Sequence, residues 1–543
     1  MTPVEMAERS VGRSSALLAS GTIASRILGF VKAIVLLQAI GVFAAGNAFA
    51  AGNQLPNTIY VIVAGGALSA VLVPQIVRSA LHTDGGTAYI NKLVTISLLV
   101  LAVTALVATL LAPFLVSITV HGFSPEQTEL ATAFAYWCLP QIFFYGVYTI
   151  LGEVLNARNS FGPFTLSPIL NNIVALLGLV VFIAVFGSDP NGTRPLAWWT
   201  PSSVALLAGT ATLGIAVQGL VLFAFWRRVG LTYRPDFQWK GVGLKQTGRI
   251  AGWSFGMILV TTAAGLVETN VVSTASGNDT ASVAALANAW LIFMLPHSVV
   301  AVSIATAYFT RMSENAATGH LERVRADLSA SIRQITVIMV LAGVVLFVLA
   351  YPFGRVMIDS QGGAAVIGNA LMAFLVGLPA FSILFVLQRA FFSLGDTRTP
   401  FYTTVFQAVV FTIGAVAVLL FVPKDLVGVG VALMLSLSGI LQTVLAGILI
   451  RRTLGGGFRR VVSSFAKDAL AALPASIGGA VVFFAFGGPD PGGFALSGRI
   501  PAIVTMAFVG AVMAVLYAVT LRLLRSSELS DAVVPIMRRL RRN

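Results

Sequence analysis

Charged residues and cysteine are both scarce in this chain. Only 10% of its 543 residues are charged while 57% are hydrophobic, and a soluble globular protein of this size carries far more charge. The single cysteine, Cys138, excludes an internal disulfide. Long apolar runs recur along the whole sequence, so we expect an all-α polytopic membrane protein rather than a barrel.

Motifs for catalysis and metal binding are also missing. The four histidines are scattered without the spacing of metal ligands. The sequence has no phosphate-binding glycine loop, no evident pair of catalytic carboxylates and no polar segment large enough to bind a nucleotide. We therefore expect no enzymatic activity, no metal and no cofactor. The net charge of +14 does not indicate nucleic acid as a partner, because the cations lie between apolar runs rather than on a polar module.

The apolar runs predict about fourteen transmembrane helices. They cover approximately residues 15–41, 54–77, 93–120, 130–155, 163–187, 202–226, 250–275, 283–309, 333–352, 364–393, 400–422, 426–450, 466–487 and 500–522.

Lysine and arginine are distributed unevenly between the segments that join these helices. Most of the 34 fall on one side of the membrane, and only Arg194, Arg355, Lys424 and Arg499 fall on the other. Basic segments stay in the cytoplasm. With an even number of spans, we expect a multi-pass protein of the bacterial plasma membrane with both termini cytoplasmic.

Leu-Pro pairs recur at corresponding positions of the two halves. Leu139-Pro140 in the fourth span resembles Leu378-Pro379 in the tenth, and each is followed by a basic turn and a proline that opens the next helix. A shift of six spans suggests parallel repeats, although coincidence is an alternative. The domains that follow are two pseudo-symmetric six-helix lobes (1–226 and 250–451) around a central cavity, a basic cytoplasmic linker (227–249), and spans 13–14 with a basic tail (452–543).

The first span contains a cation near its middle. Arg26 lies about eleven residues from the start of the apolar run, and a charge at that depth costs roughly 3 kcal/mol unless it faces water or an anion. Lys32 lies six residues later, about 120° around the helix. Both could border a cavity and bind a phosphate-like anion, and Lys32 could instead extend to the interface.

Other polar residues within or next to the spans are further candidates. Asn53, Gln54 and Asn57 surround the bend at Pro56, where they could bind substrate groups or bridge helices. Glu268 in the seventh span could bind a coupling cation or pair with Arg26, or simply lie at the outer interface.

Two charged residues flank the end of the fourth span. We interpret Glu153 and Arg158 as a coupling or gating pair, with a purely structural ion pair as the alternative.

Several of these segments resemble the MurJ/MviN family of the MOP exporter superfamily. The matching segments are Ser25–Lys32, Leu55–Asn57, Gly66–Pro74, Leu155–Pro163, Pro168–Asn172 and Asn288–Pro296, and the last is most similar to actinobacterial members. The resemblance implies flipping of lipid II, the undecaprenyl-pyrophosphate-linked peptidoglycan precursor, by alternating access, which supports cell-wall synthesis and cell shape. It also implies that spans 13–14 form a groove for the lipid tail.

The chain departs from the family pattern at charged positions. Lys32 replaces an arginine, Ala33 and Asn47 stand where acids are usual, Tyr60 and Val61 lie where a basic pair is expected, and the segment 290–295 lacks an arginine and a glutamate.

The expected partners are lipid II, membrane lipids and the cell-wall synthesis machinery. The alternatives are a flippase for another polyprenyl-linked glycan, a MATE-like multidrug or cation antiporter, and a scaffold without transport activity.

Overall fold

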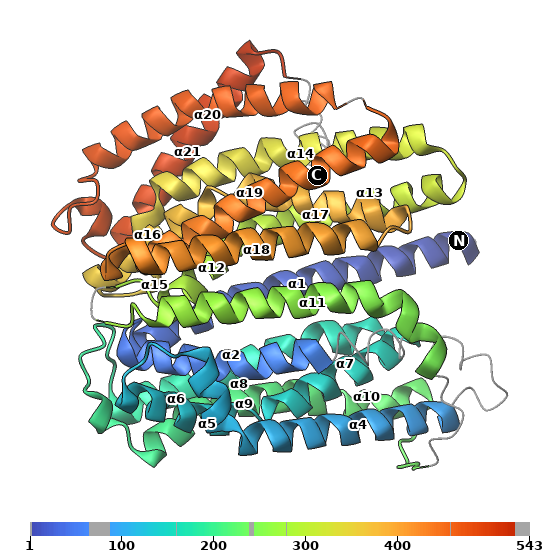
Figure 1. Cartoon of the computed structure of the whole chain (residues 1–543), viewed down its shortest axis with the longest axis vertical. Helices are drawn as coiled ribbons and strands as arrows, with labels where there is room; N and C mark the ends of the chain where they lie inside the picture. The colour runs from blue at the N-terminus through green and yellow to red at the C-terminus, as the bar shows by residue number, and fades with distance from the viewer. Residues whose placement is uncertain are drawn as a thin grey trace. The chain divides into compact units, whose positions relative to one another are not determined.

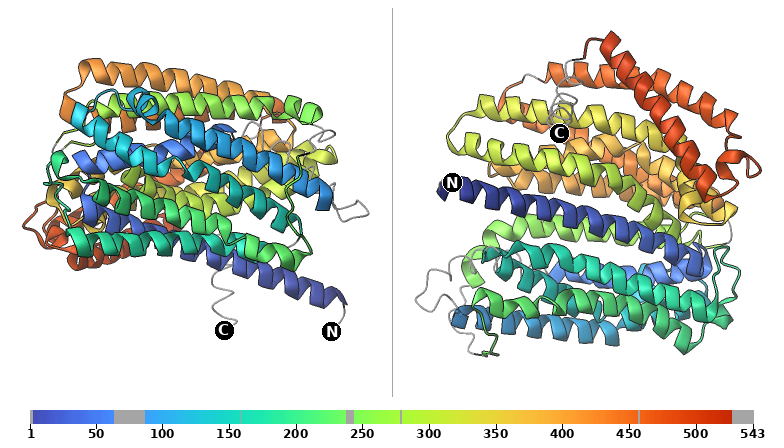
Figure 2. Two further views of the ribbon diagram at one scale, coloured as in Figure 1. Left: turned by 90° about the horizontal axis from the view of Figure 1, so that it is seen from below. Right: turned by 180° about the vertical axis from the view of Figure 1, so that it is seen from behind.

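The computed structural model describes residues 3–63, 87–158, 160–237, 244–277, 280–456 and 458–526, which form helices joined by turns (Figures 1 and 2). No β-strand occurs within these ranges. The chain divides into two compact units, Met1–Thr262 (unit 1) and Ala263–Asn543 (unit 2). The predicted all-α fold is confirmed.

Unit 1 contains the first helices and most of α11, in which the division between the units falls. Its elements are α1 (Pro3–Ile40), α2 (Ala44–Val63), α4 (Thr87–Leu110), α5 (Ala112–Thr119), α6 (Pro125–Cys138), α7 (Gln141–Ala157), α8 (Phe161–Phe186), η2 (Leu196–Trp198), α9 (Pro201–Leu220), α10 (Phe223–Trp226), η3 (Arg227–Val229) and α11 (Leu244–Ser273).

Unit 2 contains the remaining helices, and α20 and α21 pack together along one side of it (Figure 1, orange to red). Its elements are α12 (Val283–Pro296), the π-helical turn η4 (His297–Ala301), α13 (Val302–Ala317), α14 (Leu321–Val348), α15 (Ala350–Met357), α16 (Gln361–Leu375), α17 (Leu378–Ser393), α18 (Arg398–Phe421), η5 (Lys424–Leu426), α19 (Val427–Leu454), α20 (Arg459–Ala485), η6 (Phe494–Leu496) and α21 (Arg499–Leu523).

The predicted membrane spans correspond closely to these helices. Among the described residues, twelve helices are long and apolar enough to cross a membrane, or thirteen if the bent pair α16 and α17 crosses as one span. The remaining predicted span, 54–77, overlaps α2, which begins ten residues earlier than expected. The rest of that span lies outside the described residues.

The two Leu-Pro pairs that suggested a repeat both lie at helix breaks. Leu139 and Pro140 separate α6 from α7. In unit 2, α16 and α17 meet at an angle of 49°, and Leu378-Pro379 begins α17. Proline lacks the backbone donor that a continuous helix needs and clashes with the preceding turn, so each span is divided there.

Helices α1 and α8 are held together where both end. Asp189 donates its backbone N–H to the Gln38 carbonyl at 3.0 Å. The Arg194 guanidinium donates to the Ala39 carbonyl at 3.3 Å and to the Phe186 carbonyl at 2.7 Å, and it lies 4.5 Å from the Trp198 ring centroid. One cation therefore caps the carbonyl ends of two parallel helices, where the helix dipole favours positive charge.

The first part of the predicted basic linker folds back onto α4. Asn91 donates to the Thr232 carbonyl at 3.3 Å, and Lys92 lies 4.0 Å from the Asp236 carboxylate. Residues 231–237 therefore pack on unit 1 rather than extending away from it, and residues 238–243 lie outside the described ranges.

Candidate functional site

The first candidate site depends on how α1 is held against α8. Gly21, Ser25 and Gly29 recur every four residues and form one face of α1. A Cβ at Gly21 would lie 2.8 Å from the Thr165 methyl carbon, so the helices approach closely there. Small residues at this spacing allow membrane helices to pack backbone to backbone. Buried Asn172 then donates to the Ser25 carbonyl at 2.9 Å, which fixes the rotation of α1.

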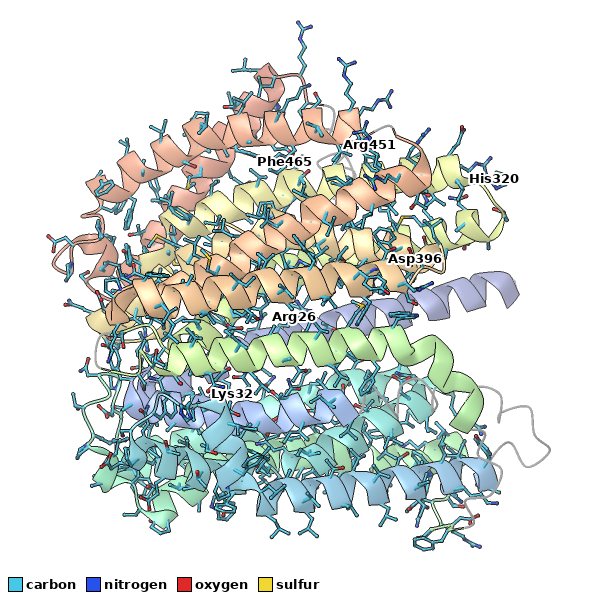
Figure 3. All side chains as sticks on the ribbon, in the orientation of Figure 1. Arg26, Lys32, His320, Asp396, Arg451 and Phe465 are labelled. Atoms are coloured by element: carbon cyan, nitrogen blue, oxygen red, sulfur yellow. The ribbon has the colours of Figure 1, made fainter. Side chains whose placement is uncertain are left out.

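Arg26 follows Ser25 and therefore points about 100° away from this face. Its side chain is half-buried, and its neighbours Ile23 and Ile27 are exposed. Within the described ranges, Arg26 has neither an ion pair nor a hydrogen bond to its guanidinium. Figure 3 shows it along the middle of α1. The structure thus places in an apolar helix a cation for which no described residue supplies a counterion.

Lys32, the second predicted cation, lies on a different side of α1. Seven residues separate it from Ser25, so the two side chains point within about 20° of each other. Lys32 is half-buried and, among the described residues, has no carboxylate partner (Figure 3). Arg26 and Lys32 therefore diverge around the helix, and Lys32 follows the face that packs on α8.

Asn53 on α2 belongs to a hydrogen-bonded network that joins helices. Its side-chain oxygen accepts from Gln141 at 3.3 Å and from the Cys138 thiol at 3.6 Å. Gln141, at the break between α6 and α7, also donates to Thr212 on α9 at 2.9 Å. These bonds are the ones that the helix-bridging alternative predicts, and substrate binding by Asn53 stays a prediction.

Gln54 and Asn57, by contrast, have exposed side chains. They are three residues apart and share one face of α2. Within the described part of the chain, neither side chain has a hydrogen-bond partner, so their amide groups are free to bind a ligand.

Tyr60, which stands where the resemblance implied a basic residue, joins α2 to α7. Its hydroxyl donates to Thr149 at 2.5 Å, and its ring lies 5.6 Å from that of Tyr145. Glu153 lies one turn beyond Thr149 and is half-buried, while Arg158 caps the end of α7. No ion pair between Glu153 and Arg158 occurs in the described structure.

Glu268 on α11 is half-buried in unit 2. The polar residues that follow it bond to their own helix: Thr269 donates to the Gly265 carbonyl at 2.9 Å and Asn270 to the Leu266 carbonyl at 3.0 Å. Glu268 has no ion pair to any residue that the structure describes. Its carboxylate is therefore the group on this turn that is available to a cation or a proton.

The segment of α12 that lacks the family charges contains an aromatic cluster instead. Trp290 stacks on Phe293 with ring centroids 4.7 Å apart, and both pack on Phe381 of α17. Buried His297 follows at η4, where its Nδ1 lies 3.0 Å from the Ser382 hydroxyl. No sequence pattern predicted the His297–Ser382 contact, because it joins residues 85 positions apart.

Comparisons with known sequences point to one family. The family model described as "Lipid II flippase MurJ" matches residues 36–487. A probable lipid II flippase MurJ of Rhizobium tropici is 27% identical over 436 residues, which cover 78% of each chain. The corresponding protein of Synechocystis sp. is 24% identical over 443 residues, covering 80% of each chain.

Solved structures show the same fold. The inward closed conformation of the lipid II flippase MurJ superposes with a TM-score of 0.73 at 18% identity, covering 94% of this chain and 99% of that one. An inward-facing multidrug resistance MATE transporter of the MOP superfamily gives a TM-score of 0.61 at 19% identity, covering 79% of this chain and 94% of that one.

Proposed function

The chain belongs to the MurJ family of lipid II flippases, and we propose that it flips lipid II from the inner to the outer leaflet with Arg26 binding the substrate's pyrophosphate. The observation that carries the assignment is the family match over residues 36–487. The family consists of transporters, and the proposed process needs no covalent chemistry. Lipid II is the peptidoglycan precursor, so the chain supports cell-wall synthesis.

The environment of Arg26 supports its role in this proposal. A guanidinium in an apolar span is costly unless an anion or water compensates its lost hydration. Arg26 has no such anion among the described residues, whereas a pyrophosphate offers several charged oxygens in the geometry that a guanidinium binds with two parallel hydrogen bonds. The substrate would thus supply the missing countercharge.

The packing of α1 on α8 also supports pyrophosphate binding by Arg26. The bond from Asn172 and the close approach at Gly21 fix which side of α1 meets α8. The position of Arg26 on α1 is consequently held about 100° from that face, because α1 is not free to rotate about its own axis. A binding group held in advance loses less entropy when its ligand arrives.

The remaining polar candidates take distinct parts in the proposal. Gln54 and Asn57 bind sugar or peptide groups through their exposed amides, and Lys32 adds positive charge further along α1. Asn53 contributes indirectly by fixing α2 against α7. Glu268 binds the coupling cation or proton, which would allow an ion gradient or the membrane potential to drive transport. Glu153 and Arg158 remain a proposed coupling or gating pair.

The protein is a multi-pass bacterial membrane protein that works among membrane lipids, and both termini are proposed to be cytoplasmic because of the cation distribution. Contact with the cell-wall synthesis machinery is also part of the proposal. The likeness to MATE transporters reflects the fold that the superfamily shares. It gives no support to an antiporter, since the family model matches most of the chain.

The experiment that tests this function is depletion of the protein in its native bacterium, with lipid II accessibility measured at the outer leaflet. Depletion should lower the accessible lipid II while total lipid II persists or rises. Unchanged accessibility during growth arrest would contradict the proposed function and would favour a flippase for another polyprenyl-linked glycan. Measuring the export of such glycans in the same cells separates the two.

A further inference from the structure

Arg389 on α17 is half-buried, whereas Arg323, Arg451 and Arg452 at the same end of unit 2 are exposed. This end is where α13 and α17 finish and where α14 and α18 begin, and Figure 3 shows Asp396 and His320 there. Arg311 forms an ion pair with Asp327 at 2.6 Å, and Arg325 donates to the Gly455 carbonyl at 3.0 Å. Arg389 has no ion pair and no hydrogen bond to its guanidinium within the described ranges.

Two aromatic rings hold the Arg389 side chain in place. The central guanidinium carbon lies 4.9 Å from the Phe385 ring centroid and 5.3 Å from that of Phe309 on α13. Such contacts restrict the faces of the guanidinium and leave its N–H edge available. The side chain is half-buried rather than freely extended. Arg389 is therefore a positioned cation whose hydrogen-bonding edge has no partner among the residues that the structure describes.

The rings continue from Arg389 along the same side of α17. Phe381, Phe385 and Arg389 are spaced by four residues and so share one face, and all three are half-buried. The His297 ring lies 4.7 Å from Phe381 and 5.4 Å from Phe385. The face thus carries a half-buried aromatic strip roughly 12 Å long, partly covered by Trp290, Phe293 and His297, with a cation at one end. An amphipathic ligand with an anionic head and an apolar chain matches this pattern.

We propose that Arg389, clamped between Phe309 and Phe385, binds the pyrophosphate of the polyprenyl-linked substrate at the arginine-rich end of unit 2. The inference rests on the proposed function and adds a second phosphate-binding residue to it, on a different unit from Arg26. A pyrophosphate concentrates more negative charge than the diester of a bulk phospholipid, and its oxygens suit the guanidinium edge. The aromatic strip favours a lipid over a free anion.

The test uses the full chain in phosphatidylcholine nanodiscs with a fluorescent short-chain lipid II analogue. Arg389→Gln should weaken binding of the analogue about 10-fold, as expected for a charge-assisted hydrogen bond in a half-buried site. Arg389→Lys should weaken it less, because the charge remains while the planar fork is lost. Replacing Phe309 and Phe385 together by leucine should weaken it about 3-fold, since the net charge is unchanged.

Two further arms identify the ligand. The matched control is Arg452→Gln, which removes an exposed arginine from the same unit and should leave binding unchanged. Phosphatidylglycerol added to the discs and soluble sodium pyrophosphate are tested as competitors, and neither should displace the analogue as well as unlabelled analogue does. Each variant must elute as a single species with the thermal midpoint of the parent, and Arg389→Lys provides a binding readout if Arg389→Gln does not fold.

Several outcomes would overturn the proposal. They are unchanged binding by Arg389→Gln, an equal loss with Arg452→Gln, and full competition by phosphatidylglycerol or by soluble pyrophosphate. If the parent protein binds the analogue and Arg26→Ala abolishes binding while Arg389→Gln does not, the Arg389 inference fails and the proposed function stands. If the parent binds no analogue, both fail.

Discussion

Asn172 of α8 donates a hydrogen bond of 2.9 Å to the backbone carbonyl of Ser25, the residue immediately before Arg26. The same amide lies 3.7 Å from the position that a Cβ would occupy on Gly29. These contacts fix the rotation of α1 one residue away from its central cation. The direction of Arg26 is therefore set by a neighbouring helix rather than by contacts of its own.

Replacing Arg26 tests the pyrophosphate contact directly. Arg26→Ala should reduce flipping by 10-fold or more and should fail to complement a depletion strain, because charge-assisted hydrogen bonds contribute roughly 1.5–3 kcal/mol. Arg26→Lys should retain part of the activity, and Lys32→Ala should have the milder effect of the two alanine changes. The measurement is outer-leaflet lipid II at matched protein levels. Normal exposure in Arg26→Ala cells would remove Arg26 from the site.

Removing the Asn172 amide should disturb Arg26 without changing any charge. Asn172→Ala should lower flipping several-fold because α1 loses its bond to α8, worth about 1 kcal/mol. Asn171→Ala is the matched control on the same helix, since Asn171 bonds to Gln218 of α9 at 2.9 Å instead. Both variants should be equally abundant in the membrane. If Asn172→Ala and Asn171→Ala lower flipping equally, Asn172 contributes only to the general stability of the helix packing.

Glu268 should matter through its charge. Glu268→Gln keeps the size of the side chain but cannot bind a cation or release a proton, so flipping should fall at least about 5-fold. Thr269→Val is the control, because Thr269 bonds only to the Gly265 carbonyl of its own helix. Flipping is measured across pH values and membrane potentials. Full activity of Glu268→Gln under all conditions would exclude a coupling role.

The cap formed by Arg194 should contribute to the stability of unit 1. Arg194→Ala removes two bonds to helix-end carbonyls and the contact with Trp198, a loss of about 3 kcal/mol. Thermal unfolding in detergent should show a lower Tm for Arg194→Ala and an intermediate one for Arg194→Lys. Arg228→Ala, which removes a single ring contact at Phe225, should leave the Tm almost unchanged. The same Tm in all four proteins would contradict the capping role.

The orientation in the membrane can be measured with reporter fusions. The turn between α5 and α6 and the turn between α20 and α21 both belong to the side with few cations, so fusions after Gly122 and after Gly492 should report from outside the cell. Fusions after Arg525 should report from the cytoplasm. A cytoplasmic signal from Gly122 would contradict the proposed topology.

Hydropathy predicted the helices because the apolar runs are local, and the Leu-Pro pairs marked breaks because proline acts on its own turn. Arg26 was predictable for the same reason, since its cost depends on depth in one span. The sequence left two roles open for Asn53, because its hydrogen-bond partner Gln141 is 88 residues away and only packing brings them together. Arg389 and Phe309 are likewise joined by tertiary contact, which periodicity along one helix cannot reveal.

The two sets of hydrogen bonds between α1 and α8 have a consequence for how α1 can move. Asn172 joins the two helices near their middles and Arg194 joins them at their ends. With two points of attachment, α1 and α8 should move as one rigid pair. Helix α1, which carries Arg26, therefore cannot rotate about its own axis independently of α8. The surroundings of Arg26 should change only when α1 and α8 move together. Arg26 should therefore pass from one environment to another in a single step rather than by gradual rotation of α1.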